Sequence, residues 1–230
     1  MHELIPQVDI CDWEEVYTCP ILPDDEYLIE ITDNFHPKIF VKPYYYEQDI
    51  KHALPRCYVR KSVAEKLILA AEKLPDDINL MLLDGWRPLE LQQELVRLFA
   101  QEIKLKFSHK SSEEQKNILD QFVAKPSLDP ECPSPHFTGG SIDLTLCDAK
   151  GRSLDMGTLF DEPVIQSWTH RMEVESQSSQ ACRNRRLLYW AMISAGFTNL
   201  PSEWWHYDYG NQLWCYFGNH QHAFYSSTSL

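Results

Sequence analysis

The chain has 230 residues and a formal net charge of −13, with 43% hydrophobic and 24% charged residues. This length and composition are ordinary for a globular protein, and we expect a single domain spanning residues 1–230. Such an acidic surface repels phosphate backbones and anionic lipid, so neither nucleic acid nor a membrane is an expected partner. A small zwitterionic substrate and a homo-oligomer both stay open.

The first third of the chain alternates short apolar segments with proline. Residues 1–25 are rich in Pro and acidic groups and are expected to wrap the surface as an N-terminal segment. Residues 27–31 are expected to form a short strand, and residues 32–55 an irregular stretch in which Asn and Pro recur. A capping-box pattern at 62–65, followed by apolar residues at helical spacing, predicts a helix over 62–74.

The middle of the chain predicts a buried strand and two helices. Residues 78–83 form a short apolar run that leads into Asp84-Gly85-Trp86-Arg87-Pro88. Pro88 suits the first position of the next helix, where its missing N–H is no loss. A further helix with a Ser cap is expected over 112–124, and four prolines make residues 125–135 a stiff loop.

The last third mixes strands with one clear helix. Residues 139–146 predict a strand, and residues 183–195 a helix ended by Gly196 in the left-handed cap position. Residues 204–217 predict two short strands around Gly210-Asn211. Separate helices and hairpin-like strands together predict an α+β fold with a central, mainly antiparallel sheet and flanking helices.

The cysteines and the lack of long apolar runs bear on the cellular compartment of the protein. Seven cysteines occur at positions 11, 19, 57, 132, 147, 182 and 215, and no pair has the C-x-x-C spacing of a zinc knuckle. The N-terminus lacks a basic region followed by an apolar run, and no stretch approaches 18 consecutive apolar residues. We therefore expect neither a signal peptide nor a membrane span, and free thiols in a cytoplasmic protein in preference to a disulfide framework.

Two short segments combine imidazoles with carboxylates. Residues 134–143 contain His136 and Asp143, and residues 203–206 contain Glu203 and His206. A catalytic zinc commonly takes three nitrogen or oxygen ligands and keeps a fourth position for water, and a nearby carboxylate accepts that water's proton. Two His, one Asp and one Glu meet this requirement.

The spacing within each segment constrains the geometry. Positions 203 and 206 are an odd number apart, so on a regular strand they would face opposite sides, and Glu203 is expected on the loop that enters the strand. Gly139-Gly140 permits a turn or bulge that brings His136 and Asp143 to the same side. Asp143 lies in an apolar strand, where a carboxylate is costly unless it is paired, bound to metal or turned toward solvent.

The motifs S-x-H-x-x-G-x-x-x-D at 134–143 and E-x-W-H at 203–206 resemble the signature of the VanX-type zinc D-alanyl-D-alanine dipeptidases. That group of D,D-peptidases shares its fold with the Hedgehog signalling domain. Residues 84–88 resemble its D-G-[YW]-R-P segment, residues 156–161 its M-G-x-x-F-D segment, and residues 33–35 its D-N-F segment. The matches occur in family order and cover most of the chain, although residues 101–130 and 173–182 match no motif.

The resemblance implies a role for each matched residue. One Zn²⁺ per chain would be held by His136, Asp143 and His206, with Glu203 as the general base and Arg87 stabilising the tetrahedral intermediate. Ser134 and Asp161 match positions that hold the ends of the dipeptide. The implied reaction is hydrolysis of D-alanyl-D-alanine to two D-alanines, which affects the supply of cell-wall precursors.

Three other functions compete with this interpretation. A zinc D,D-carboxypeptidase or endopeptidase acting on peptidoglycan stem peptides would use the same metal set, but such an enzyme usually needs export. A non-catalytic zinc-binding interaction domain would need neither Glu203 nor Arg87. A binding module without a cofactor would require the motifs to be coincidence.

Overall fold

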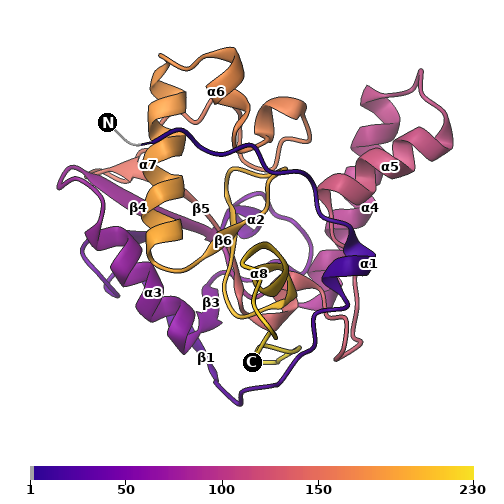
Figure 1. The fold of residues 1–230 in the computed structure, drawn as a ribbon, viewed down its shortest axis with the longest axis horizontal. Helices are drawn as coiled ribbons and strands as arrows, with labels where there is room; N and C mark the ends of the chain where they lie inside the picture. Colours follow the sequence, from indigo (N-terminus) through magenta and orange to yellow (C-terminus); the bar gives the residue numbers. More distant parts are fainter. Residues whose placement is uncertain (1–2) are drawn as a thin grey trace.

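A five-stranded sheet lies in the middle of the molecule (Figure 1). The computed structural model describes residues 3–230, without the side chains of residues 121 and 122. The strand order is β2 (Ile39–Val41), β4 (Ile78–Asp84), β5 (Ser141–Asp148), β7 (His206–Asp208) and β6 (Thr198–Asn199). The β2–β4 pair is parallel and the other neighbours are antiparallel. The predicted α+β fold with a mainly antiparallel sheet is therefore confirmed.

The two central strands, β4 and β5, are apolar along most of their length because both faces of the sheet are covered. Leu80 and Leu82 face the main core, which also contains residues of α3 (Lys61–Glu72) and α7 (Gln180–Ser194). Met81 and Leu83 alternate to the other face, beside Phe160 and α2 (Tyr44–Glu47). A separate antiparallel pair, β1 (Leu28–Ile31) with β3 (Cys57–Arg60), packs against α3.

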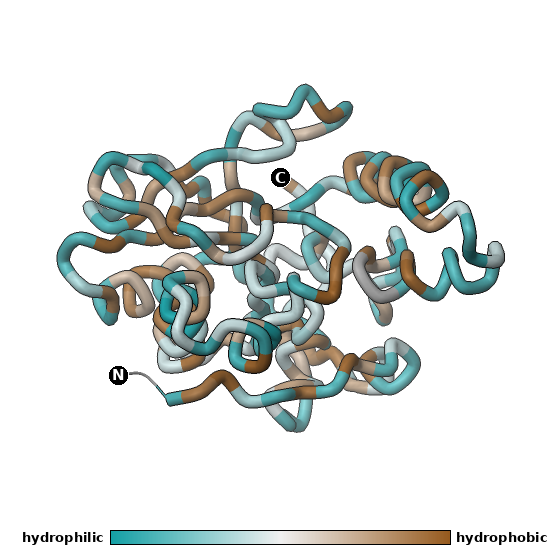
Figure 2. Tube along the Cα trace, turned by 90° about the horizontal axis from the view of Figure 1, so that it is seen from above, coloured by the Kyte–Doolittle hydropathy of each residue, from teal (hydrophilic) through white to brown (hydrophobic). Residues whose placement is uncertain are grey.

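Two antiparallel helices, α4 (Leu89–Lys106) and α5 (Ser112–Phe122), form an arm on one side of the molecule (Figure 1). Ser111 and Glu114 make a capping box at the start of α5, so the predicted Ser cap is confirmed. Helix α4 buries Leu95, Phe99 and Ile103, which follow one another at the four-residue spacing of one helix face. Viewed from above, the arm at the right edge alternates between hydrophilic and hydrophobic residues (Figure 2).

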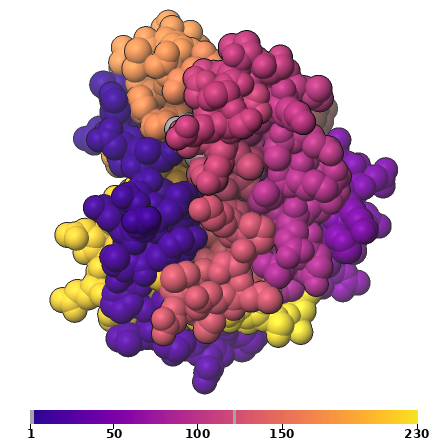
Figure 3. All heavy atoms as spheres, turned by 90° about the vertical axis from the view of Figure 1, so that its right-hand side faces the viewer, coloured from indigo at the N-terminus to yellow at the C-terminus, as the bar shows by residue number. Residues whose placement is uncertain are grey.

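Residues 3–25 run across the surface and contain the short helix α1 (Trp13–Val16) (Figures 1 and 3). Gln212, at the start of α8 (Gln212–Phe217), donates hydrogen bonds to the carbonyl oxygens of Cys19 and Glu131, each at 2.9 Å. It thereby joins the N-terminal segment to the proline-rich loop. None of the helices in residues 3–230 combines the length and apolar content needed to cross a bilayer.

The short elements depart from the sequence predictions. Strand β2 and helix α2 lie within residues 32–55, where an irregular stretch was expected. Residues 212–217 form helix α8 in place of the second predicted strand, because the Asn211 side chain accepts a hydrogen bond from Trp214 N and caps a helix. Helix α7 begins at Gln180, three residues before the predicted start, with the Ser179 side chain as its cap.

The capping box predicted at 62–65 is wrong. Arg60 occupies the N-cap position of α3 and makes no capping hydrogen bond through its side chain. The hydroxyl and backbone N–H of Ser62 donate instead to the carboxylate of Glu26, at 2.6 and 3.1 Å. Glu26, which is distant in sequence, is therefore the partner of Ser62 in place of the predicted Glu65.

Candidate metal and active site

His136 lies in a single 3₁₀ turn, η1 (Pro135–Thr138), directly before β5. Gly139 ends this turn with φ of +74°, and a Cβ at that position would lie 2.5 Å from Leu28 Cδ2. Glycine therefore allows both the left-handed conformation and the close packing. The Nδ1 atom of His136 lies 2.8 Å from the carbonyl oxygen of Gly85, so it carries the proton and leaves the lone pair on Nε2.

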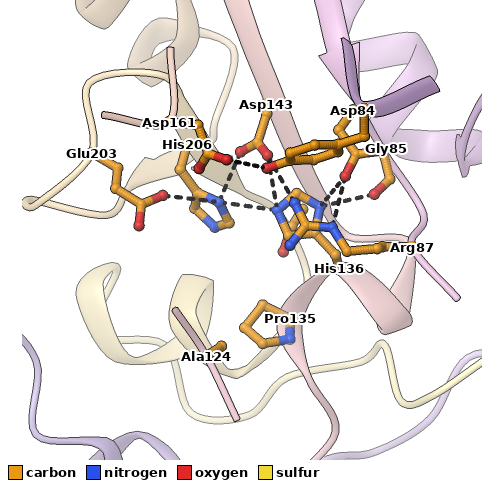
Figure 4. Close-up of polar contacts among 12 residues, drawn as sticks. Asp84, Gly85, Arg87, Ala124, Pro135, His136, Asp143, Asp161, Glu203 and His206 are labelled. Atoms are coloured by element: carbon orange, nitrogen blue, oxygen red, sulfur yellow. Dashed lines mark hydrogen bonds and ion pairs between the residues drawn. The ribbon is translucent and has the colours of Figure 1, made fainter. Parts of the chain in front are cut away.

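The predicted metal ligands converge from three elements (Figure 4). His136 Nε2 lies 3.2 Å from His206 Nδ1 and 3.4 Å from Asp143 Oδ2, and His206 Nδ1 lies 3.1 Å from Asp143 Oδ1. The register of β5 and β7 pairs Asp143 directly with His206, and all three residues are buried. Asp143 therefore faces inward, which excludes the solvent-facing alternative.

The donor set fits a zinc ion. Zinc ligands at about 2.0–2.1 Å from a tetrahedral centre lie about 3.3 Å from one another, which is close to the separations between these atoms. Two imidazoles and one carboxylate suit zinc better than magnesium or calcium, which prefer oxygen ligands. Burial alone would raise the pKa of Asp143, but the two imidazoles hold it well below its ordinary value. Asp143 is thus charged and ready to bind a cation.

Glu203 lies in the turn that enters β7, as the odd spacing from His206 predicted. Its Oε2 atom is 3.9 Å from His206 Nδ1, and the side chain lines the cavity at the cluster (Figure 4). Burial raises the pKa of Glu203 to about 8. A carboxyl group whose pKa is near neutrality suits both the acceptance and the release of a proton.

Arg87 is held on three sides. Its Nε donates to Asp84 Oδ2 at 2.8 Å, its Nη1 to Gln92 Oε1 at 2.7 Å, and its Nη2 to Asp143 Oδ2 at 3.1 Å. Burial opposes the charge on Arg87, but the neighbouring Tyr45, Asp84 and Asp143 raise the guanidinium pKa above its ordinary value. The arginine is therefore a fixed cation in the cavity wall.

Asp161 also lines the cavity, in an unusual backbone conformation. Its φ is +63°, in the left-handed region that non-glycine residues seldom adopt. Among the described residues, its carboxylate receives one hydrogen bond, from Tyr45 OH at 3.0 Å. Burial raises the pKa of Asp161 to about 7. A strained residue that aims a poorly paired carboxyl group at a cavity is a candidate for ligand binding.

Ser134 is placed differently from the other predicted site residues. Its hydroxyl donates to Lys125 O at 2.8 Å and accepts from Ser127 N at 2.7 Å. Its side chain therefore holds the start of the proline-rich loop, and it is not among the described residues that line the cavity. Direct contact between Ser134 and a substrate stays a prediction.

Several residues at the site were not found from the sequence. Gln92 accepts a hydrogen bond from Arg87, Tyr45 donates one to Asp161, and Trp13 and Ala124 add walls to the cavity. Nothing in the local sequence marks these four. Asp208 contacts His206, and here a signal did exist, because residues two apart on a strand share one face.

A buried two-histidine, one-aspartate cluster beside a glutamate and a fixed arginine is the equipment of a metal-assisted hydrolase. Residues 44–227 match the peptidase family M15, described as D-ala-D-ala dipeptidase, and the chain belongs to this family. The D-alanyl-D-alanine dipeptidase of Synechocystis sp. is 33% identical over 182 residues, which cover 71% of this chain and 74% of that protein.

Two further similarities were found. The D-alanyl-D-alanine dipeptidase of Escherichia coli is 43% identical over 75 residues, which cover 33% of this chain and 37% of that protein. A solved structure of VanYB in complex with D-alanine-D-alanine aligns with 18% identity and a TM-score of 0.48, over 87% of this chain and 88% of that chain.

Proposed function

We propose that this chain hydrolyses the dipeptide D-alanyl-D-alanine with one zinc ion held by His136, Asp143 and His206. Family membership supports the substrate. The convergence of three donor atoms, within 4.8 Å of one another in a buried site, is the observation that carries the proposal of a metal. When bound, zinc polarises the scissile carbonyl and makes a bound water acidic enough to ionise near neutral pH.

Glu203 is the proposed general base. Its carboxylate accepts a proton from the attacking water and then delivers that proton to the nitrogen of the leaving D-alanine. Both transfers need a carboxyl group whose pKa is near the working pH, and burial supplies that shift. The Oε2 atom of Glu203 lies 3.9 Å from Nδ1 of His206, one of the proposed ligands, and this distance supports a role beside the metal and not in its coordination.

Arg87 is the proposed oxyanion donor. Its three hydrogen bonds fix the guanidinium before substrate arrives, so no reorganisation is needed as negative charge grows on the carbonyl oxygen. Loss of such a donor typically costs about 3–4 kcal/mol in the activation barrier.

Asp161 is the proposed partner of the substrate's ammonium group. A free N-terminus would neutralise a carboxylate that makes no ion pair among the described residues, which favours a dipeptide over an acylated peptide. Trp13 and Ala124 wall the same cavity and support this size limit. A D,D-carboxypeptidase that accepts long stem peptides would need a more open cleft.

The substrate is tested by incubating zinc-loaded protein with D-Ala-D-Ala, L-Ala-L-Ala and a pentapeptide that ends in D-Ala-D-Ala. Release of D-alanine from the D,D-dipeptide alone is expected. Cleavage of the pentapeptide at a similar rate would favour the carboxypeptidase. Zinc binding without any hydrolysis would favour a non-catalytic interaction domain.

The general base is tested by Glu203→Ala. Because Glu203 is not a ligand in this proposal, the variant should keep its zinc, while kcat falls by about 10²–10⁴-fold, the usual contribution of a positioned base. Zinc content by atomic absorption and D-alanine release are measured on the same sample. A Glu203→Ala variant that remains active would show that another group takes the proton.

We further propose that the protein acts in the cytoplasm. Seven free cysteines, five of them buried, are typical of a reducing compartment. Hydrolysis of D-Ala-D-Ala there would limit its incorporation into cell-wall precursors.

A further inference from the structure

Asp208 is a buried carboxylate to which the mechanism above gives no task. Its side chain is 0% exposed and receives hydrogen bonds from three groups. Ser141 Oγ donates at 2.6 Å and Asn211 Nδ2 at 2.7 Å, while His206 Nε2 lies 3.1 Å from one carboxylate oxygen and 3.2 Å from the other. A buried carboxylate with this many donors is held in one orientation.

The sheet explains how these groups meet. His206 and Asp208 are two residues apart on β7 and so share one face, and β5 pairs Ser141 directly with Asp208. Asn211 caps α8 with its side-chain oxygen, which leaves its amide group free to donate to Asp208. Strand, neighbouring strand and helix start therefore all fix the same carboxylate.

Nε2 of His206 lies within hydrogen-bond distance of both carboxylate oxygens of Asp208, so the geometry assigns a proton to this nitrogen. In the neutral imidazole the lone pair then lies on Nδ1, the atom 3.2 Å from His136 Nε2 and 3.1 Å from Asp143 Oδ1. The opposite tautomer would point an N–H at the metal position and a lone pair at Asp208. A carboxylate behind a ligating histidine is a recognised way to fix the ring and its tautomer.

We propose that Asp208 is a positioning residue for the metal site, which it serves by holding His206 in the tautomer and ring orientation that present Nδ1 to zinc. This inference rests on the zinc site proposed above. Gly85 O plays the equivalent part for His136, so each imidazole has an acceptor behind it. The two acceptors differ, because the one behind His206 is charged and the one behind His136 is a backbone carbonyl.

The test compares Asp208→Ala with Glu173→Gln. Glu173 pairs with Arg186 on α7 and accepts from Ile5 N, outside the residues that line the cavity, so its loss is a control for general destabilisation. The zinc Kd of each folded protein is measured by competition with a chromophoric chelator. Asp208→Ala should raise the Kd by about 10–100-fold, as loss of a partner behind a ligand typically does. Glu173→Gln should leave it unchanged.

A second measurement uses the unmodified chain, in case Asp208→Ala does not fold. In zinc-loaded protein labelled with ¹⁵N-histidine, His206 should show a protonated Nε2 and a metal-bound Nδ1. Ligation through Nε2, an unchanged Kd in a folded Asp208→Ala protein, or no zinc at this site would each overturn the inference. Zinc binding with the expected Kd shift but no hydrolysis of D-Ala-D-Ala would defeat only the proposed substrate.

Discussion

At the scale of single residues, the site concentrates buried acids whose charges the fold treats differently. Asp143 and Asp208 are kept ionised by their partners, whereas burial raises the pKa values of Glu203 and Asp161. All four acids are buried in the same region, so burial alone cannot explain why their pKa values differ. The difference comes from the hydrogen-bonding and charged partners of each group. The two acids with raised pKa values are those assigned to the proton and to the substrate.

Asp161 makes this contrast testable through the pH dependence of stability. Its folded-state pKa of about 7 lies above the ordinary value, so the folded protein binds the proton more tightly than the unfolded chain does. The resulting stabilisation is complete below about pH 4 and is lost as pH rises toward 7. The free energy of unfolding therefore falls over this interval because of Asp161.

We expect Asp161→Asn to remove this pH-dependent fall in the free energy of unfolding, since Asn resembles the protonated acid and tolerates positive φ. With metal removed from both proteins, its stability advantage over the unchanged chain should grow by about 2–3 kcal/mol between about pH 5 and pH 8, at roughly 1.4 kcal/mol per pH unit. Urea unfolding at both pH values measures the difference. An advantage that is equal at both pH values would contradict the raised pKa of Asp161.

At the scale of elements, the sequence predicted what periodicity and caps determine. Helix α3 and strand β4 were found because their apolar spacing is local, and helix α5 also because of its Ser cap. Strand β2 and helix α8 were missed or misassigned, since β2 has three residues and is defined by its pairing with β4, and α8 depends on the Asn211 cap. The form of β2 thus depends on a partner that is distant in sequence, whereas α8 depends on a single local cap.

The residues of the site also divide into those that local motifs indicate and those that only the fold brings together. His136, Asp143, Glu203 and His206 were found because two short motifs contain them, and the parity argument placed Glu203 correctly. Tyr45, Gln92 and Trp13 act through contacts that only the assembled fold creates. Ser134 lies in one of the two motifs, but its hydroxyl forms hydrogen bonds with Lys125 and Ser127 of the loop. A motif position therefore does not by itself place a side chain at the cavity.

The N-terminal segment contributes a wall that lies outside residues 44–227, the part matched by the family. Trp13 packs beside Leu200 and Leu213 and lines the cavity. Trp13→Ala should open this wall, so that kcat/KM for a tripeptide ending in D-Ala-D-Ala rises relative to the dipeptide. A change of about 10-fold or more is expected, within the range that altered pocket contacts give.

The matched control for this wall is Trp190→Ala. Trp190 also holds the N-terminal segment, through a hydrogen bond from Nε1 to Glu3 O at 2.8 Å, but it does not line the cavity. The ratio of tripeptide to dipeptide hydrolysis should stay unchanged in Trp190→Ala. If both variants change the ratio equally, the segment acts through its general attachment and not through the Trp13 side chain.

At the scale of the whole molecule, the metal site joins segments that are far apart in the chain. The main core contains residues from Ile31 to Tyr225, and the three proposed ligands come from η1, β5 and β7. A site assembled in this way exists in the folded chain and not in the unfolded one, so metal binding stabilises folding. Unfolding should therefore release the zinc.

Zinc removal should lower the melting temperature. At a free zinc concentration about 100 times the Kd, binding adds about 2.7 kcal/mol, which corresponds to roughly 5–10 °C for a chain of this size. Differential scanning calorimetry with zinc and with a chelator measures the shift, and one cooperative transition is expected if residues 1–230 form a single domain. A melting temperature that does not respond to zinc would argue against a structured metal site.

The hydrogen bonds of Gln92 connect Arg87 to the end of the arm. Its side-chain oxygen accepts from Arg87 Nη1, and its amide donates to Ala124 O at 2.7 Å, where the arm returns to the cavity. Any outward displacement of residues 123–124 must break the second bond or pull Gln92 away from the arginine. Arg87, the proposed oxyanion donor, would then lose one of the three hydrogen bonds that fix its guanidinium, so its orientation depends on the position of a loop that is distant in sequence.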